Sequence, residues 1–429
     1  MEIYTVKEGD TLWSVASEYG MSAEMLQADN QLTDSKLAVG QTLVIQEPLQ
    51  THTVQRGDTL TGIADMYQTT PDALLRLNPV LHGQGVLYPG QILTVRTEEE
   101  RLGTFSVNGY AYPFIDRTLL HTVLPYLSEL TPFTYGLDIQ GNIYAPEDAP
   151  LIKLAAQYRV SPVMHISTLR ADGYFDNTLS EAVMTDVRAQ DRFVEQALQT
   201  MREKGYRILD IDFEFVPAAQ ASVYAQLVAR LRTAVNAMGG EVMVALAPKT
   251  SRAQKGLLYE GHDYRLLGEA ADRLLLMTYE WGYTFGPPMA VAPLNRVREV
   301  VEYALTRISA SKLFLGVPTY GYDWTLPYVR GGAGAPSLSP VEATQIAVER
   351  GAEILYDETA QAPWFRYLDD DGRLHEVWFE DARSISAKLR LAEELNLYGI
   401  GYWNSMRKFP QNWIILNANY NILNLSLAD

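Results

Sequence analysis

Three acidic residues alternate with apolar ones in the stretch YRILDIDFEFVP. A period of two indicates a β-strand, so Asp210, Asp212 and Glu214 share one face at a spacing of roughly 7 Å. Like charges on one face repel and exclusion of water adds a desolvation cost, so we expect at least one carboxyl group to keep its proton near neutral pH. Such a group can act as a general acid. The alternative is a solvated edge strand, but Phe213 and Phe215 on the opposite face favour burial.

The elements that must position these acids follow from eight apolar, β-rich runs that alternate with helical segments within residues 102–429. The runs are 103–109, 132–138, 161–168, 207–214, 241–248, 272–280, 312–320 and 397–404. Eight βα units predict an α/β fold, the (β/α)₈ barrel, whose functional residues lie at the C-terminal ends of the strands. We therefore expect Glu214, Tyr279, Glu280 and Trp403 to converge at one mouth.

One interval between strands is too long for a loop. Residues from about 321 to 381 contain GGAGAP, DDDG and the strand-like runs WFRYL and EVWFE. They predict a small α+β insertion that forms one wall of the cleft.

Composition narrows the function classes. A chain of 429 residues predicts two or three domains. A formal charge of −17 argues against a nucleic acid or an anionic membrane as partner. The absence of cysteine excludes disulfides, thiolate catalysis and cysteine-bound zinc. The six histidines are widely spaced and no phosphate-binding or dinucleotide motif is present, so we expect neither a metal nor a cofactor.

The N-terminus lacks the basic and apolar regions of a secretory signal, and no apolar run reaches membrane-spanning length. We therefore expect synthesis in the cytosol. Nothing in the sequence demands a dimer, so we expect a monomer.

The first hundred residues contain a repeat. Residues 4–30 align with 52–78, and each copy ends in a short strand, VGQTLVI or PGQILTV. The shared Gly-Asp-Thr step predicts a turn followed by a helix N-cap. Each copy therefore predicts a strand, two helices and a strand, with domain boundaries at 2–47 and 50–96.

These two βααβ repeats resemble LysM domains, which bind polymers containing N-acetylglucosamine, such as peptidoglycan and chitin. The resemblance implies a glycan groove beside the first turn and the loop between the helices. That groove would comprise Gly9, Asp10, Thr11, Leu12, Asp29 and Asn30 in the first module and Gly57, Asp58, Thr59, Leu60, Leu77 and Asn78 in the second. Two modules would add avidity. The alternative is that the repeats only mediate protein contacts.

DIDFE, MTYEW and GYWN together resemble glycoside hydrolase family 18, whose fourth strand carries the signature Asp-x-x-Asp-x-Asp-x-Glu. Arg207 replaces the first aspartate of that signature, Ile208 replaces the usual glycine, and Glu280 stands where the family commonly has aspartate. The tandem LysM repeats, the phrase MTYEWGY with GPPMAVAP behind it, and the insertion are similar to the branch of the family that acts in spore germination, glycosylases of cortex peptidoglycan.

The resemblance implies a substrate-assisted, retaining mechanism. Glu214 would protonate the glycosidic oxygen while the acetamide carbonyl of the sugar attacks its own anomeric carbon. Asp212, backed by Asp210, would orient the acetamide, and Tyr279 would donate a hydrogen bond to its oxygen. Trp403 would form the floor beneath the sugar. Tyr279 and Trp403 could instead be ordinary core residues.

Glu280, Met277 and Asn404 complete the implied substrate site. For Glu280 a salt bridge is an equally good interpretation.

The predicted function is cleavage of β-1,4 bonds after N-acetylglucosamine in cortex peptidoglycan fragments, at the boundary between spore coat and cortex. Two alternatives remain: a chitinase, because the insertion is rich in aromatic residues, and a catalytically inactive glycan-binding protein.

Overall fold

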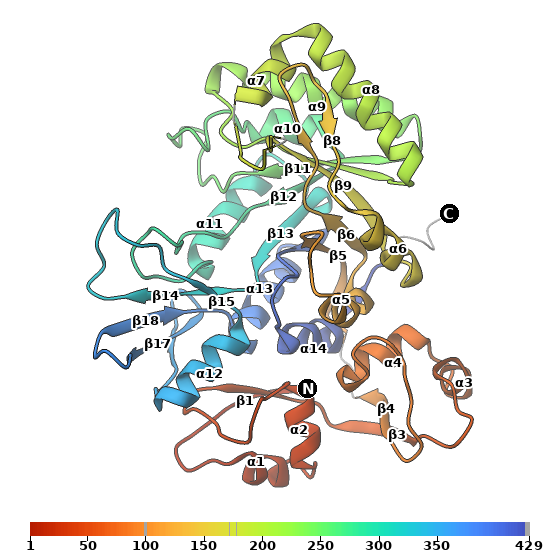
Figure 1. The fold of residues 1–429 in the computed structure, drawn as a ribbon, viewed down its shortest axis with the longest axis vertical. Helices are drawn as coiled ribbons and strands as arrows, with labels where there is room; N and C mark the ends of the chain where they lie inside the picture. Colours follow the sequence, from red (N-terminus) through yellow and green to blue (C-terminus); the bar gives the residue numbers. More distant parts are fainter. Residues whose placement is uncertain (98–100, 171, 177, 425–429) are drawn as a thin grey trace.

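The computed structural model describes residues 1–97, 101–170, 172–176 and 178–424. Its centre is a closed barrel of eight parallel strands, which confirms the predicted (β/α)₈ fold (Figure 1). The barrel strands are β5 (Gly103–Ala111), β6 (Glu129–Pro132), β9 (Ser161–Ser167), β10 (Ile208–Asp212), β11 (Glu241–Leu246), β12 (Arg273–Leu276), β13 (Leu313–Pro318) and β19 (Gly399–Trp403). Pairing of β19 with β5 closes the ring, and β20 (Tyr420–Ile422) extends β5 outside it.

Helices between the strands cover the outside of the barrel. They are α5 (Arg117–Val123), α6 (Ala149–Gln157), α7 (Thr178–Thr185), α8 (Val187–Lys204), α9 (Ala221–Asn236), α10 (Tyr264–Ala270), α11 (Leu294–Leu305), α13 (Ala382–Glu394) and α14 (Pro410–Asn419). In α8, the buried residues Ala189, Phe193, Ala197 and Met201 recur every four positions, which places them on one helical face. Asp186 caps its first turn and Gly205, at φ +76°, ends it.

Alternate residues of the strands pack in two separate layers. Leu209, Ile211 and Phe213 belong to the large core between barrel and helices. Ile208 faces the other way, into a core inside the barrel that includes Tyr110 and Phe133. Asp210 and Asp212 share the inward face with Ile208, because side chains alternate along a strand.

The predicted second strand, residues 132–138, is wrong in position. The barrel strand is β6, and residues 136–137 instead form β7 (Gly136–Leu137), which pairs with β8 (Ile143–Tyr144) in a small hairpin. β6 does not appear as an apolar run in the sequence because it begins with a charged residue, Glu129. This residue is fully buried and forms an ion pair with Arg273 from β12.

The two N-terminal modules have the predicted βααβ order. The first comprises β1 (Glu2–Thr5), α1 (Leu12–Glu18), α2 (Ala23–Asp29) and β2 (Thr42–Ile45), and the second β3 (Pro48–Thr53), α3 (Leu60–Met66), α4 (Pro71–Leu77), the short 3₁₀ helix η1 (Pro79–Leu81) and β4 (Ile92–Thr97). In each, the two strands pair antiparallel and a separate small core lies beneath the helices.

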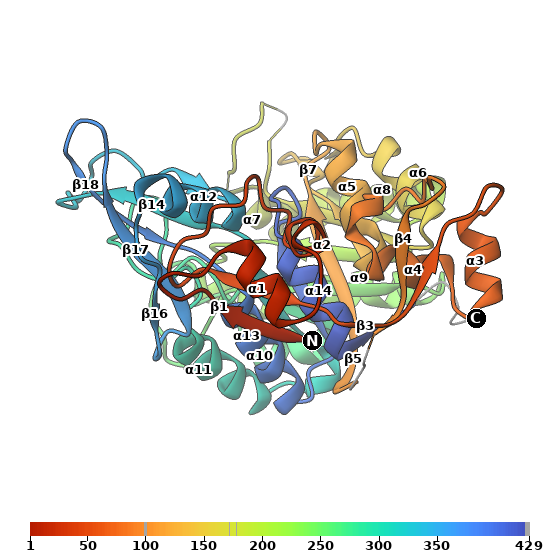
Figure 2. The ribbon, with the colours of Figure 1, turned by 90° about the horizontal axis from the view of Figure 1, so that it is seen from below.

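Both modules pack directly on the barrel domain (Figure 2). For the first, the Gln411 side chain of α14 donates to the carbonyl of Thr42 at 2.6 Å, and Arg383 of α13 donates to the carbonyl of Gly40 at 3.2 Å. For the second, the Tyr158 hydroxyl donates to the carbonyl of Gly83 at 2.7 Å.

Between β13 and α13 the chain forms a separate antiparallel sheet of five strands. It comprises β14 (Gly321–Thr325), β15 (Ser337–Leu338), β16 (Leu355–Asp357), β17 (Ala362–Leu368) and β18 (Leu374–Trp378), with α12 (Pro340–Arg350) packed against it. This is the α+β architecture predicted for the long interval.

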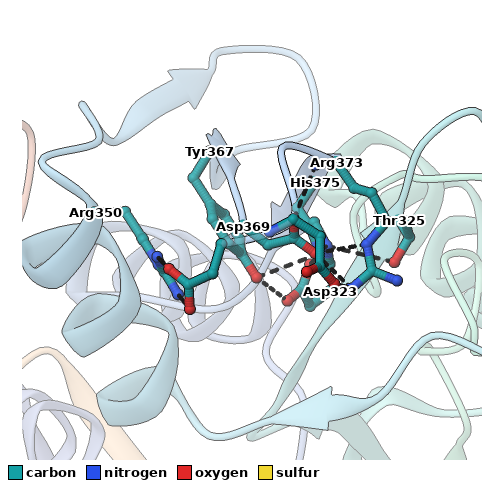
Figure 3. Close-up of polar contacts among 9 residues, drawn as sticks. Asp323, Thr325, Arg350, Tyr367, Asp369, Arg373 and His375 are labelled. Atoms are coloured by element: carbon teal, nitrogen blue, oxygen red, sulfur yellow. Dashed lines mark hydrogen bonds and ion pairs between the residues drawn. The ribbon is translucent and has the colours of Figure 1, made fainter.

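A polar cluster ties the strands of this sheet together (Figure 3). His375 lies between two carboxylates, with Nδ1 2.8 Å from Asp323 and Nε2 3.3 Å from Asp369, and the Tyr367 hydroxyl donates to Asp323 at 2.6 Å. Burial would raise the pKa of Asp369, but hydrogen bonds from Arg373 and His375 outweigh this effect and lower it to about 2. The carboxylate therefore stays ionised at neutral pH.

Within the described ranges, every helix is too short or too polar to cross a lipid bilayer.

Candidate active site

The three acids of the strand 4 motif lie in a row at the C-terminal end of β10. Asp210 and Asp212 belong to the strand, and Glu214 follows two residues beyond its end. After Glu214 the backbone turns sharply, since Phe215 has a φ of +53°. The alternation read from the sequence therefore places all three carboxyl groups toward the barrel axis, with Glu214 nearest the mouth.

Asp210 is fully buried at the inner end of the row. The Tyr110 hydroxyl of β5 donates to Asp210 Oδ2 at 2.8 Å. Burial raises the pKa of Asp210 to about 6, although His165 and the Tyr110 hydrogen bond act in the opposite direction.

A histidine links the two inner acids. His165 Nε2 on β9 lies 3.7 Å from Asp210 and 3.5 Å from Asp212. Its Nδ1 is 2.6 Å from the Thr134 hydroxyl. Register explains the placement, because His165 pairs with Asp210 across β9 and β10. The sequence alone predicts no role for His165, and the signal it offers is the position of this histidine in the strand next to the acidic one.

Glu214 has the properties of a general acid. Burial raises its pKa to about 8, and the neighbouring Asp212 contributes in the same direction. The carboxyl group is therefore protonated at neutral pH. Behind it, the carbonyl of Phe213 lies 2.9 Å from His262 Nε2, which anchors the strand end from outside the barrel.

Aromatic residues from two other strand ends join the acids. Tyr279 lies just beyond β12, Trp403 ends β19, and their ring centroids are 6.4 Å apart with nearly parallel planes. Trp403 also contacts the rings of Tyr110 and Phe133. Burial raises the pKa of Tyr279 well above its usual value and nearby Asp212 adds to this effect, so its hydroxyl remains a hydrogen-bond donor throughout the neutral range.

Glu280 has tyrosine partners. The Tyr322 hydroxyl donates to its carboxylate at 3.0 Å and the Tyr320 hydroxyl donates as well. Burial raises the pKa of Glu280, and the two tyrosines partly offset that rise. Among the described residues, the partners of Glu280 are these two hydroxyl groups and not a cationic side chain, so the salt bridge considered as the alternative is not formed. Tyr322 lies on β14, so the insertion contributes directly to the site.

Met277 and Asn404, the remaining predicted contacts, also follow the ends of barrel strands. Met277 comes directly after β12, and its amide donates to the carbonyl of Leu246. The Asn404 side chain accepts from the amide of Met406 at 3.1 Å. Arg207, in contrast, precedes β10 and is exposed at the opposite end of the barrel.

In the modules, two of the predicted glycan-binding side chains form hydrogen bonds within the module itself. The Asn30 amide donates to the carbonyl of Val44 at 2.9 Å and its oxygen accepts from the same residue's amide at 2.7 Å. Asn78 repeats this arrangement with Thr94. Both residues are buried, as are Leu12, Asp29 and Leu77. Their side chains therefore help to hold each module together, and their direct contact with a glycan stays a prediction.

The Gly-Asp-Thr turns remain near the surface. Asp10 accepts from the amide of Lys7 at 2.7 Å, and Asp58 accepts from the amide of Gln55 at the same distance. Thr11 and Thr59 cap the helices that follow. Gly9 and Gly57 are exposed at positive φ, and Leu60 is half-buried.

Trp13, beside the first turn, is 59% exposed and was not among the predicted residues. Its position in the sequence, directly after Gly-Asp-Thr-Leu, could have indicated a place beside the first turn.

Among the described residues, no three histidine, aspartate or glutamate side chains are grouped so as to hold a metal ion.

Two protein families match parts of this chain. The model for glycosyl hydrolases family 18 matches residues 171–407, and the LysM domain model matches residues 4–46 and 52–96. The cortical fragment-lytic enzyme of Bacillus subtilis (strain 168) is 40% identical over 430 residues, which is 99% of each chain.

Two solved structures bear on the fold. The spore cortex-lytic enzyme SleL of Bacillus cereus matches with a TM-score of 0.83 and 34% identity, over 99% of this chain and 98% of that one. A chitinase from Chromobacterium violaceum ATCC 12472 matches with a TM-score of 0.68 over 73% of this chain and 98% of that one, at 23% identity, and so shows the fold alone. The chain therefore belongs to glycosyl hydrolases family 18, as a glycosidase that carries two LysM domains ahead of its barrel.

Proposed function

We propose that this glycosidase hydrolyses the β-1,4 bond after N-acetylglucosamine in fragments of spore cortex peptidoglycan during germination. The observation that carries the proposal is the protonated Glu214, whose pKa is about 8, next to Asp212 at the barrel mouth. The substrate class is supported by the relative named cortical fragment-lytic enzyme, which matches this chain over 99% of its length, LysM modules included.

In the proposed reaction, Glu214 donates its proton to the glycosidic oxygen as that bond breaks. The acetamide carbonyl oxygen of the sugar forms a bond to the anomeric carbon, which gives an oxazolinium ion. Water then adds to this carbon and returns its proton to Glu214, so the configuration is retained. No side-chain nucleophile is required in this mechanism.

Asp212 is placed to bind the acetamide N–H and to stabilise the positive charge that develops on the ring. Asp210 stands behind it, and His165 contacts both carboxylates at distances of 3.5 to 3.7 Å. Tyr279 supplies a hydroxyl donor for the acetamide oxygen. These four side chains come from three strands, so the barrel fixes their mutual geometry before substrate arrives.

The remaining residues are proposed to hold the sugar. Trp403 offers an apolar face beneath it, and Met277 and Asn404 border the same strand ends. Glu280 is proposed to accept a hydrogen bond from a sugar hydroxyl, with its carboxylate oriented by Tyr320 and Tyr322.

The modules, with proposed bounds 2–47 and 50–96, are proposed to retain the enzyme on glycan. Gly9, Asp10 and Thr11 in the first module, and Gly57, Asp58, Thr59 and Leu60 in the second, border the candidate grooves. Trp13 adds an exposed aromatic surface to the first groove. We further propose that the catalytic domain, residues 102–429 with its insertion at about 321–381, acts as a monomer at the boundary between coat and cortex after synthesis in the cytosol.

The two alternatives receive less support. A chitinase shares the barrel, but the solved chitinase covers only 73% of this chain at 23% identity. An inactive glycan-binding protein would be expected to have lost an acid of the motif, whereas Asp210, Asp212 and Glu214 are all present.

Mass spectrometry of digestion products tests the proposal. Wild type, Glu214→Gln and the matched surface variant Glu195→Gln are incubated separately with cortex muropeptides and with chitin oligomers. We expect new reducing-end N-acetylglucosamine from cortex fragments with wild type and Glu195→Gln, and a loss of at least about a hundredfold with Glu214→Gln. Cleavage of chitin alone, or equal activity of Glu214→Gln, would contradict the proposal.

A further inference from the structure

A polar cavity lies outside the barrel, between its surrounding helices. It has an open volume of about 660 Å³, and its lining includes the first residue of α9, the first turn of α10 and Tyr303 of α11. None of the proposed catalytic or sugar-contacting residues lines it. Four cationic side chains do: Lys249, Arg252, Arg265 and Arg307. This concentration is unusual in a chain with a formal charge of −17.

Lys249 is the buried member of this group. It is only 3% exposed, and its ammonium makes one hydrogen bond, 3.1 Å long, to the carbonyl of His262. Burial lowers its pKa, while Asp263 and Glu260 act in the opposite direction. An ammonium has three donors and is costly to bury without an anion. Its charge is therefore only partly compensated in the described residues.

The two carboxylates of the cavity are engaged elsewhere. Asp263 caps α10 and accepts from the amides of Arg265 and Leu266 at 3.0 and 3.1 Å. Glu260 forms an ion pair with Lys255 at 3.0 Å. Of the four cationic groups, Arg265 is itself paired with Glu269 at 2.9 Å. The lining thus retains three cationic side chains, Lys249, Arg252 and Arg307, beside its two acidic ones.

The backbone around Lys249 is fixed. Its amide donates to the Tyr264 hydroxyl at 3.0 Å, and that hydroxyl donates to the carbonyl of Ala247 at 2.6 Å. Tyr264 in turn packs on Tyr303, with ring centroids 5.3 Å apart. An aromatic wall and two anchored loops therefore hold the ammonium in place, which is the preorganisation expected of a binding site.

We propose that this cavity binds an oxyanion, a carboxylate or a phosphate, with Lys249 as its central contact and the arginines at its rim. Guanidinium and ammonium groups together suit such anions, because each contact is a charge-assisted hydrogen bond. Two sources have this chemistry: a carboxylate on the peptide part of peptidoglycan, and a free anion such as inorganic phosphate. The first source rests on the proposed function; the site itself does not.

The cavity also has a physical connection to the catalytic strand. His262 accepts from Lys249 through its carbonyl, and its ring Nε2 lies 2.9 Å from the carbonyl of Phe213, the residue before Glu214. An anion bound at Lys249 would therefore lie behind the strand end that carries the general acid, outside the barrel interior.

Calorimetric titration with inorganic phosphate tests the site directly, in the full-length Glu214→Gln protein so that glycan probes are not cleaved. We compare that protein with versions that also carry Lys249→Met, Arg307→Gln or Lys153→Met, the last being an exposed lysine on α6 and the matched control. We expect Lys249→Met to weaken phosphate binding by about tenfold or more, Arg307→Gln to weaken it less, and Lys153→Met to leave it unchanged. No phosphate or muropeptide binding by the parent, or equal binding by Lys249→Met, would overturn the proposal.

A muropeptide and the same molecule with amidated carboxylates distinguish the two sources. If the parent binds the amidated muropeptide more weakly than the unmodified one, and Lys249→Met binds the two equally, the ligand is the peptide carboxylate. A response to phosphate alone identifies a free anion. Because phosphate binding requires no glycan, it can succeed even if cortex cleavage by the wild type fails.

Thermal unfolding separates a binding role from a folding role. Without anion, Lys249→Met should unfold at the same or a higher temperature, because an apolar side chain replaces a buried charge. Phosphate should raise the unfolding temperature of the parent and not of the variant. If Lys249→Met is destabilised, its loss of binding could reflect a folding defect, and the test then rests on Arg307→Gln, whose position is exposed. Unchanged phosphate affinity in Arg307→Gln would overturn the proposal.

Discussion

Glu214 and Asp210 are both carboxyl groups whose pKa burial raises, to about 8 and about 6, yet their surroundings differ. Asp210 has a tyrosine donor and a histidine beside it, which favour its ionised form. Glu214 has Asp212 as its neighbour, which favours the protonated form. The different surroundings therefore favour a protonated Glu214 and an ionised Asp210, although the two lie within five residues of each other.

The pKa of Glu214 predicts a pH-dependent stability difference between wild type and Glu214→Gln. Folding raises this pKa from 4.5 to about 8, so the group contributes stability that is complete below pH 4.5 and lost as the pH rises through 8. Glutamine carries no charge and loses nothing over that range. Thermal unfolding should find the variant equal to wild type at acidic pH and more stable, by on the order of 5 kcal/mol, above about pH 8.

Glu195→Gln, at an exposed position of α8, is the control for this comparison. It should follow wild type at every pH. A constant gap between wild type and Glu214→Gln would mean that the carboxyl is not protonated in the folded protein.

His165 should act on the reaction through the inner acids. Its removal in His165→Asn takes away one of the two groups that lower the pKa of Asp210, so that pKa should rise above its value of about 6. We expect kcat to fall by about tenfold and the acidic limb of the kcat profile to move to higher pH. A uniform loss of activity, with the pH profile in place, would indicate that His165 only supports the fold.

Strand periodicity and register explain which elements could be predicted. The alternation around Asp212 located β10 and its acids, and parallel strands necessarily bring Tyr279 and Trp403 to the same end. Residues buried as charged pairs escaped the same reasoning, since Glu129 and Arg273 satisfy one another only after the barrel closes. Partners such as His165 depend on register between strands, which one sequence does not display.

The insertion should influence substrate affinity more than turnover. Tyr322 on β14 donates to Glu280, and its removal in Tyr322→Phe leaves that carboxylate less well oriented and raises its pKa further. We expect KM to rise about fivefold with kcat nearly unchanged, because the tyrosine does not touch the acids on β10. Steady-state kinetics on a soluble muropeptide measures this split, with the exposed Tyr283→Phe as control.

A fall in kcat equal to the loss in kcat/KM would place Tyr322 and Glu280 in the chemical step instead.

The LysM modules pack against the barrel domain and are not merely joined to it by a linker. The first module contacts the first turns of α13 and α14, which begin on the side of the barrel mouth because barrel helices run antiparallel to the strands. Gly40 also lies close against the insertion, since a Cβ there would overlap the carbonyl oxygen of Ile354, between α12 and β16. A glycan held by this module would therefore keep a fixed relation to the catalytic domain.

Gly40→Ala should release the first module while leaving the catalytic site intact. The added methyl group must displace Ile354, whose amide donates to the carbonyl of Val39 at 2.8 Å. We expect faster amide exchange at Ile354 and in the first turn of α14, a larger radius of gyration in X-ray scattering, and unchanged cleavage of a soluble muropeptide. Gly20→Ala is the matched control, because Gly20 also has a left-handed φ, +63°, but meets no atom within 4 Å. Both variants bear the strain of a left-handed backbone at a non-glycine residue, about 1 kcal/mol. Release of the module in both variants would therefore mean that the module itself unfolds. Release in Gly40→Ala alone would show that the contact at Gly40 holds the module on the barrel domain.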